Sequence, residues 1–130
     1  MTDAAPFRLW TGDDAPSLVL DCGGTPVDDL VLSRQTEPNG YFWEGVLTLL
    51  DPLLADSLEL DSEADMFCAY GEISSLDRAR VLLEPYVLEP ERMASLLDRA
   101  DAEGIDLDDL ADPMPVGRPT LFSRLFRRHG

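Results

Sequence analysis

The stretch "EPNGYFWEG", Glu37 to Gly45, joins a turn signal to three consecutive aromatic residues, an acid and a second glycine. Pro38 disfavours a helical conformation for Glu37, and Asn39 is a strong N-cap for a helix that begins directly after it. Apolar residues then recur at helical spacing, at Phe42, Val46, Leu49, Leu50 and Leu53, with Trp43, Leu47 and Leu54 beside them. This pattern predicts a largely buried helix whose aromatic side chains fill a core.

Two residues interrupt this helical pattern. Gly45 costs about 1 kcal/mol relative to alanine in a helix interior, so we expect another part of the chain to press against the backbone there, such as a crossing strand or a bulky ring. Pro52 predicts a kink or the start of a new helical turn. Both are packing arguments, and neither requires a ligand.

The sequence before this helix predicts two short strands, "FRLW" (Phe7 to Trp10) and "SLVLDC" (Ser17 to Cys22), on either side of the turn formers "TGDDAP". A first helix is expected next, with Thr25 as its N-cap and Pro26 as its first residue.

The sequence after the aromatic helix predicts a hairpin in "SLELDSEADMFCAYG", with "MFCAYG" as a central strand covered on both faces. Two helices follow in "SSLDRARVLLEPYV" and "PERMASLLDRADAEG", the second ending at Gly104. A short edge strand and a loop are expected in "IDLDDLADPMPVGRP". This order of elements predicts a single α+β domain, with an antiparallel or mixed sheet and helices packed on it.

Charge is the strongest global signal, because the 130 residues include 26 acids and 10 bases, for a net charge of -16. Residues 1–115 contain every acid and six arginines, whereas residues 116–130 contain four arginines and no acid. We expect an acidic domain over 1–115 and a basic, flexible tail over 116–130. Such an acidic domain repels phosphate backbones, which argues against direct nucleic-acid binding. The acidity either keeps the protein soluble or attracts a basic partner.

Missing residue types limit the chemistry. There is no lysine, and the only histidine is His129 beside the C-terminus, so Schiff-base catalysis, a P-loop and a histidine-based triad are poorly supplied. An enzyme would have to use carboxylates, and the many acids single out no pair. We predict no catalytic residue and no cofactor.

A metal site and a disulfide are also disfavoured. Asp61, Glu63, Asp65 and Glu72 match the first, third, fifth and twelfth positions of a calcium loop, but Met66 stands where that loop needs glycine. A solvated hairpin tip is therefore the expected structure. Cys22 and Cys68 are expected as buried free thiols, although a bridge is geometrically possible if their strands pair.

The chain has no apolar run long enough to span a membrane, and its first residues lack the features of a signal peptide. We therefore expect a cytoplasmic protein that does not insert into membranes. The sequence leaves the oligomeric state open.

Two motifs carry a resemblance to a known family. "EPNGYFWEGV", followed further along by "DSEADMFCAYG", resembles the immunity-protein family numbered fifty-one of bacterial polymorphic toxin systems, and "LVLDCGGTPVDDLV" is similar to the start of that family. The resemblance covers roughly Ser17 to Asp109. Pro52 and the arginine-rich segment from Val116 depart from the family pattern.

The resemblance implies a small cytoplasmic α+β protein that binds and neutralises a cognate bacterial toxin domain without catalysis, the toxin being a basic one such as a nuclease. Buried aromatics with a rim of acids are the expected contacts, and the candidates are Tyr41, Trp43, Glu44, Asp61, Glu63, Asp65 and Tyr70. Packing of Tyr41, Trp43 and Tyr70 inside the core is the competing interpretation. The alternative function is a general interaction or adaptor module, with an acidic surface for solubility and the tail for docking.

Overall fold

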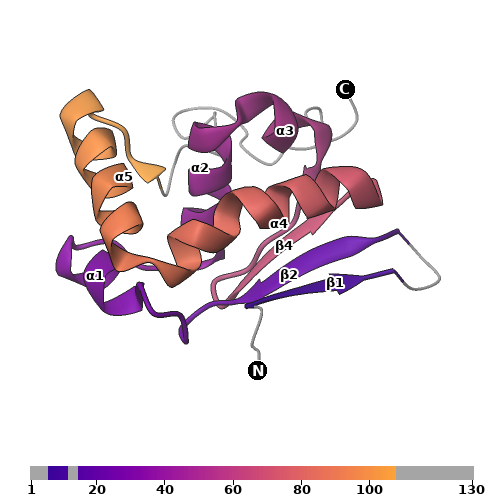
Figure 1. The fold of residues 1–130 in the computed structure, drawn as a ribbon, viewed down its shortest axis with the longest axis horizontal. Helices are drawn as coiled ribbons and strands as arrows, with labels where there is room; N and C mark the ends of the chain where they lie inside the picture. The colour runs from indigo at the N-terminus through magenta and orange to yellow at the C-terminus, as the bar shows by residue number, and fades with distance from the viewer. Residues whose placement is uncertain (1–5, 12–14, 108–130) are drawn as a thin grey trace, which may run out of the picture.

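The computed structural model describes residues 6–11 and 15–107, which form one α+β domain (Figure 1). Its elements, in chain order, are β1 (Phe7–Trp10), β2 (Ser17–Asp21), α1 (Asp28–Ser33), α2 (Gly40–Leu50), α3 (Pro52–Ser57), β3 (Glu59–Leu60), β4 (Met66–Tyr70), α4 (Ile73–Leu88) and α5 (Pro90–Glu103). The described strands form one antiparallel sheet in the order β1-β2-β4-β3. The predicted single α+β domain is confirmed, and the sheet is antiparallel.

β4 is a central strand, as predicted, because it pairs with β2 on one side and β3 on the other. The described helices cover only one of its faces, which corrects the expectation of cover on both. Leu20 of β2 lies opposite Phe67 of β4, and Val19 lies opposite Cys68. Since neighbouring residues of a strand point to opposite faces, these two pairs lie on different faces of the sheet.

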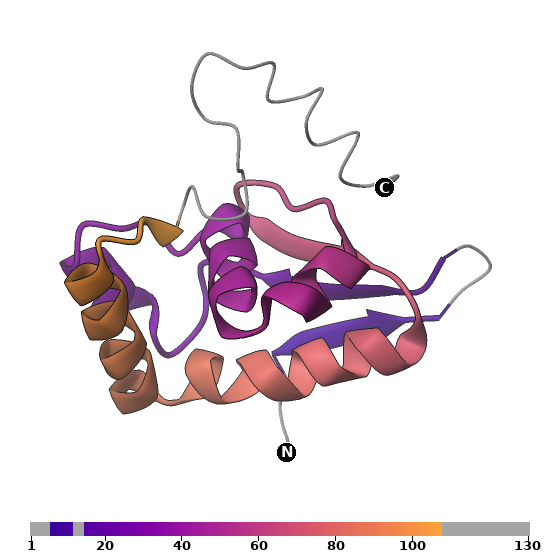
Figure 2. The ribbon, with the colours of Figure 1, turned by 90° about the horizontal axis from the view of Figure 1, so that it is seen from above.

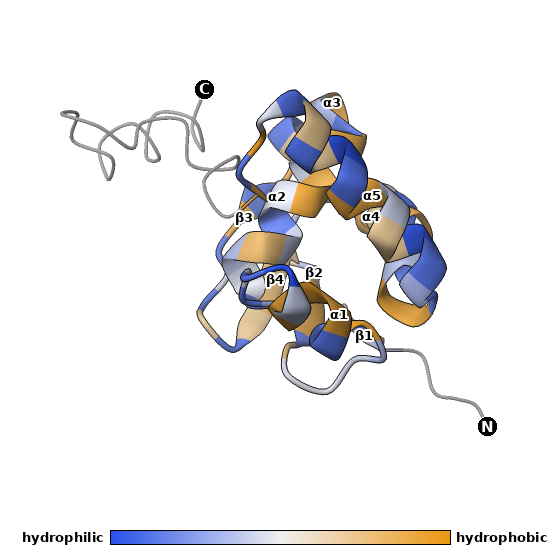
Figure 3. Cartoon of the chain, turned by 90° about the vertical axis from the view of Figure 1, so that its left-hand side faces the viewer, coloured by the Kyte–Doolittle hydropathy of each residue, from blue (hydrophilic) through white to orange (hydrophobic). Residues whose placement is uncertain are grey.

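One face of the sheet packs against the helices. α4 packs on β1 and β2, whereas α2 packs on β4, and α5 packs on α4 (Figure 2). The buried side chains between these layers form one hydrophobic cluster, in which the sheet contributes Phe7, Leu18, Leu20, Leu60, Phe67 and Ala69. Figure 3 shows apolar segments, in orange, on both the helices and the strands that enclose this interior. All helices therefore share a single core.

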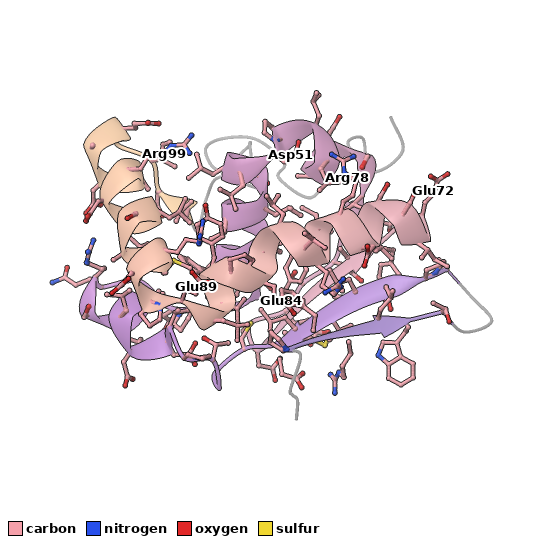
Figure 4. All side chains as sticks on the ribbon, viewed as in Figure 1. Asp51, Glu72, Arg78, Glu84, Glu89 and Arg99 are labelled. Carbon is pink, nitrogen blue, oxygen red and sulfur yellow. The ribbon has the colours of Figure 1, made fainter. Side chains whose placement is uncertain are left out.

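The helix that begins after Asn39 is α2, and its predicted cap is confirmed. The Asn39 side chain accepts a hydrogen bond from the Phe42 backbone N–H at 2.8 Å. At the other end, Pro52 begins the separate helix α3, and Asp51 caps it by accepting from the Leu54 N–H at 3.1 Å. Asp51 also pairs with Arg78 of α4 at 3.4 Å (Figure 4).

The break at Pro52 overturns one core assignment. Leu53 was expected on the buried stripe, but its side chain is 82% exposed. The periodicity that includes Leu53 assumes one continuous helix. Because α3 starts anew at Pro52, the helical phase changes there, and Leu54 is buried instead.

Gly45 makes the close backbone contact that the sequence predicts. A Cβ at this position would meet the backbone of Leu107, with the Leu107 carbonyl carbon at 2.8 Å. The contact is thus made by the segment that follows α5, not by a crossing strand or a ring. Gly40 at the start of α2 is equally tight, because a Cβ there would meet the carbonyl oxygens of Glu63 and Met66.

One helix start and one expected strand differ from the sequence-based expectation. α1 begins at Asp28 with Val27 as its N-cap, while Thr25 lies in the preceding turn, where its hydroxyl bonds to the Asp28 carboxyl group. The edge strand expected from Ile105 onward is not present at 105–107, and its remaining residues lie outside the described part. The expected tail over 116–130 also lies outside the described residues. Gly104 ends α5 as predicted, in the left-handed conformation with φ of 69°.

Candidate protein-binding surface

The sheet face opposite the helices is the candidate functional surface, and we call it the open face. Within residues 6–11 and 15–107 no helix covers it (Figures 1 and 3). Strand register and side-chain alternation place three rows of side chains on it. The first row is Trp10, Ser17, Tyr70 and Glu59, the second is Arg8, Val19, Cys68 and Asp61, and the third is Asp21, Met66 and Glu63. Its middle is apolar and its β3 side is acidic.

The β3–β4 hairpin supplies the acidic side of the open face. The Asp61 N–H donates to the Cys68 carbonyl at 2.9 Å, and the Glu63 N–H donates to the Met66 carbonyl at 2.7 Å, so the antiparallel register continues beyond β3. Glu59, Asp61 and Glu63 therefore point to the same face at every second position. All three are exposed, as is Asp65 in the turn of the hairpin.

The centre of the open face is formed by Val19 and Cys68. Both are buried, with 7% and 3% exposure, yet neither belongs to the hydrophobic cluster under the helices. Tyr70 of the neighbouring row is half-buried, and its interaction with the Cys68 thiol raises the pKa of Tyr70. Burial raises the pKa of Cys68.

A buried acid from the helix layer fixes the hairpin. Glu44 of α2 is 1% exposed, and its carboxyl group accepts a hydrogen bond from the Ser62 N–H at 3.0 Å. The Ser62 hydroxyl in turn accepts from the Cys68 N–H at 3.0 Å. Together with the contact of Gly40 against the hairpin backbone, these bonds hold the acidic strand in register with β4.

The structure brings together four of the seven predicted contact residues. Asp61, Glu63 and Tyr70 lie on the open face, and Asp65 lies at the hairpin tip beside it. Tyr41 is 41% exposed, at the start of α2 in the helix layer.

Two predicted contacts are wrong. Trp43 is fully buried and stacks edge-on against Phe42 with ring centroids 5.2 Å apart, so it is a core residue. Glu44 is also buried and binds Ser62 within the protein. Neither side chain can touch a partner of the folded domain.

Sequence reasoning missed Trp10, Val19 and Arg8 as residues of this face. Trp10 is 59% exposed, and Arg8 pairs with Asp21 at 3.0 Å. The period-two rule places Arg8 and Trp10 on the face opposite Phe7, which was a usable signal once "FRLW" was identified as a strand.

The described arginines lie mainly on the helix side of the domain. Each of the six described arginines lies within 4 Å of a carboxylate, in the pairs Arg8–Asp21, Arg34–Asp98, Arg78–Asp51, Arg80–Asp77, Arg92–Glu89 and Arg99–Glu103. All except Arg8 belong to α4, to α5 or to the end of α1. The open face thus carries one arginine and four acids.

The two cysteines are free thiols in this structure. Their strands do pair, but the register places Cys68 opposite Val19, whereas Cys22 lies beyond the end of β2. Burial raises the pKa of Cys22 to about 11. Neither thiol is therefore a ready nucleophile near neutral pH.

Other kinds of site find no support in the described part of the chain. No group of three His, Cys, Asp or Glu side chains there is arranged to hold a metal ion, including the hairpin acids. None of the described helices combines the length and apolar character needed to cross a membrane.

Comparison with known proteins returns nothing at the level of family, relative or fold. No protein-family model matches this chain, and neither the curated proteins nor the solved structures contain a match. The resemblance to the immunity-protein family therefore stays a prediction from the sequence.

Proposed function

We propose that this protein is a non-catalytic, cytoplasmic binding protein that neutralises a basic partner by occupying it, as an immunity protein does for its cognate toxin domain. The open face is the proposed contact surface. One observation carries the proposal, namely the segregation of charge, with the described arginines paired mainly on the helix side and the acids Glu59, Asp61 and Glu63 aligned on the open face.

Physical reasoning links this segregation to binding. Exposed ion pairs contribute at most about 1 kcal/mol each to stability, but they neutralise the cations of the helix layer. The aligned acids Glu59, Asp61 and Glu63 make the β3 side of the open face attractive to a basic protein and raise the rate of its association. The exposed Trp10 and the half-buried Tyr70 supply the aromatic contact area that protein interfaces favour.

The residue inventory is consistent with binding rather than chemistry. The chain has no lysine, and its only histidine is His129. The described cysteines are protonated thiols at neutral pH because burial raises the pKa of each. A stoichiometric inhibitor needs none of these groups, whereas acyl transfer and covalent catalysis do.

The direct test is co-expression with the toxin encoded by the adjacent gene, combined with binding measured by calorimetry. A triple variant of the open face, Glu59→Gln with Asp61→Asn and Glu63→Gln, is expected to lose roughly 10-fold or more in affinity and to lose protection. A matched triple variant with the same charge change but located on α3 and α5, Asp56→Asn with Glu91→Gln and Asp101→Asn, should still protect.

Two outcomes would count against the proposal. Equal loss in both triple variants would mean that net charge alone matters and that the open face is not the contact surface. Loss of protection on deletion of residues 116–130, with both triple variants active, would instead favour an adaptor that docks through its basic segment.

A further inference from the structure

The first row of the open face places two aromatic side chains on either side of a small one. Ser17 lies opposite Trp10 in β1 and opposite Tyr70 in β4, and Tyr70 lies opposite Glu59 in β3. Strands are spaced about 4.8 Å apart, so Trp10 and Tyr70 stand roughly 10 Å apart on one face with Ser17 between them. The row ends at a carboxylate.

Trp10 is a large exposed side chain on an edge strand. It is 59% exposed, and it lies outside the hydrophobic cluster that the buried described residues form. Tyr70 differs, because it is half-buried on a central strand. An exposed indole and a half-buried phenol on the same face favour binding over packing.

The charges around this row select the sign of the partner. Glu59 ends the row, Asp61 and Glu63 follow along the same side, and the one arginine of the face already pairs with Asp21. With a net charge of -16, a second copy of the chain would be repelled, as would nucleic acid and anionic membranes. A cationic protein segment is the occupant that the charges fit.

We infer that the open face is an arginine-selective docking surface, in which a guanidinium group of the basic partner lies over Ser17 between Trp10 and Tyr70 and pairs with Glu59. Neighbouring strands lie about 4.8 Å apart, so a guanidinium group beside Ser17 can reach the side chains of both flanking strands for cation–π contacts. This inference rests on the proposed function and specifies what the partner must present.

Arginine fits this row better than lysine. Its guanidinium group is planar and weakly hydrated, so it stacks on an aromatic face and still donates to a carboxylate at its edge. The lysine ammonium is compact and strongly hydrated, and it gains mainly Coulomb energy, which both cations share. Selectivity between the two cations therefore reports on the aromatic pair separately from the acidity.

The experiment measures the affinity of the full-length protein for two synthetic peptides of equal length and charge, alternating glycine with arginine or glycine with lysine, at about 0.15 M salt. The arginine peptide is expected to bind roughly 5- to 30-fold more tightly, as two exposed cation–π contacts predict. Trp10→Leu and Tyr70→Leu should each reduce this preference by several-fold while leaving lysine affinity nearly unchanged. Tyr70→Phe keeps the ring and should retain the preference.

A control and an independent measurement guard against effects of misfolding. Leu53→Ala, an exposed apolar substitution on α3, should change neither affinity. Trp43→Phe leaves Trp10 as the only tryptophan, so a fluorescence change on adding the arginine peptide reports contact at the open face without altering it.

The outcomes separate this inference from the proposed function. Equal affinity for both peptides, unaffected by Trp10→Leu and Tyr70→Leu, would overturn the arginine selectivity and leave the binding of basic proteins intact. Failure to bind either peptide would overturn both. A dimer of the unmodified protein that Trp10→Leu converts to monomer would also overturn the inference, because the face would then be an interface between copies.

Discussion

Replacing Glu44 tests whether this buried acid holds the hairpin or contacts a partner. The Glu44 carboxyl group accepts a 3.0 Å hydrogen bond from the Ser62 N–H, and both residues are buried. Glu44→Ala removes the acceptor and leaves a buried N–H without a partner, which costs about 2–3 kcal/mol. Glu44→Gln keeps an acceptor oxygen, and we expect a loss of about 1 kcal/mol.

The measurement is the free energy of unfolding from urea titration, followed by far-ultraviolet circular dichroism. For a domain of this size, the Glu44→Ala loss corresponds to a decrease in Tm of about 8–12 °C. Asp56→Ala, which removes an exposed acid of α3, is the control and should change stability by no more than about 0.5 kcal/mol.

Hydrogen exchange locates the effect. The amide of Ser62 and the amide of Cys68, which is bonded to the Ser62 hydroxyl, should exchange faster in Glu44→Ala. A Glu44→Ala protein with unchanged unfolding free energy but lost partner binding would refute this reasoning, since Glu44 would then be a contact residue after all.

Three further predictions follow from the packing and from the thiol chemistry. Gly45→Ala should lower the free energy of unfolding, measured in urea, by a net amount of about 1–2 kcal/mol. The new methyl group meets the Leu107 backbone, which cannot rotate away, and the gain in helix propensity of about 1 kcal/mol does not offset this clash. Gly24→Ala, with open space around it, should be neutral. Trp43→Phe should cost less than about 1.5 kcal/mol, because the lost Nε1–H is buried without a hydrogen-bond partner among the described residues, whereas Trp43→Ala should cost about 3–5 kcal/mol. The pKa of Cys22 is raised from 9.0 to about 11, so its iodoacetamide alkylation at pH 8 should be roughly 100-fold slower than that of a free thiol. The stabilising contribution of the protonated Cys22 thiol should be complete below pH 9 and lost as the pH rises to 11. Two results would contradict this prediction. One is rapid alkylation of Cys22 in the folded protein at pH 8. The other is a difference in unfolding free energy between the unmodified protein and Cys22→Ala that is the same at pH 8.5 and pH 11.

Local signals in the sequence predicted the fold well. Asn39 caps α2 because a cap depends on neighbouring residues alone, and Pro52 restarts the helix for the same reason. Leu53 was misplaced because the restart changes the helical phase, and a periodic pattern cannot register that change. Gly45 indicated a close contact with another part of the chain, but which segment makes that contact depends on tertiary structure.

The candidate surface was harder to predict than the fold. Trp43 and Glu44 lie between Phe42 and Gly45 in a run that is buried throughout. The prediction that Glu44 contacts a partner overlooked that an acid inside an apolar run is often hydrogen-bonded within the protein, as Glu44 is to Ser62. Trp10 was missed because a strand of four residues does not reveal which of its faces the helices will cover. Asp61 and Glu63 were expected to be exposed because a hairpin tip is exposed in nearly any packing, and the structure confirms their exposure, while their contact with a partner stays a prediction.

The one-sided arrangement of the domain has a consequence for how such a protein can diversify. Folding depends on the layer between helices and sheet, where Leu20 and Phe67 lie, whereas Trp10, Tyr70 and Glu59 lie across the sheet from it. Sequence drift on that outer side can therefore retune partner choice while the scaffold keeps its shape. A saturation library confined to these outer positions should yield mostly folded variants, and a library of the same size in the core should not.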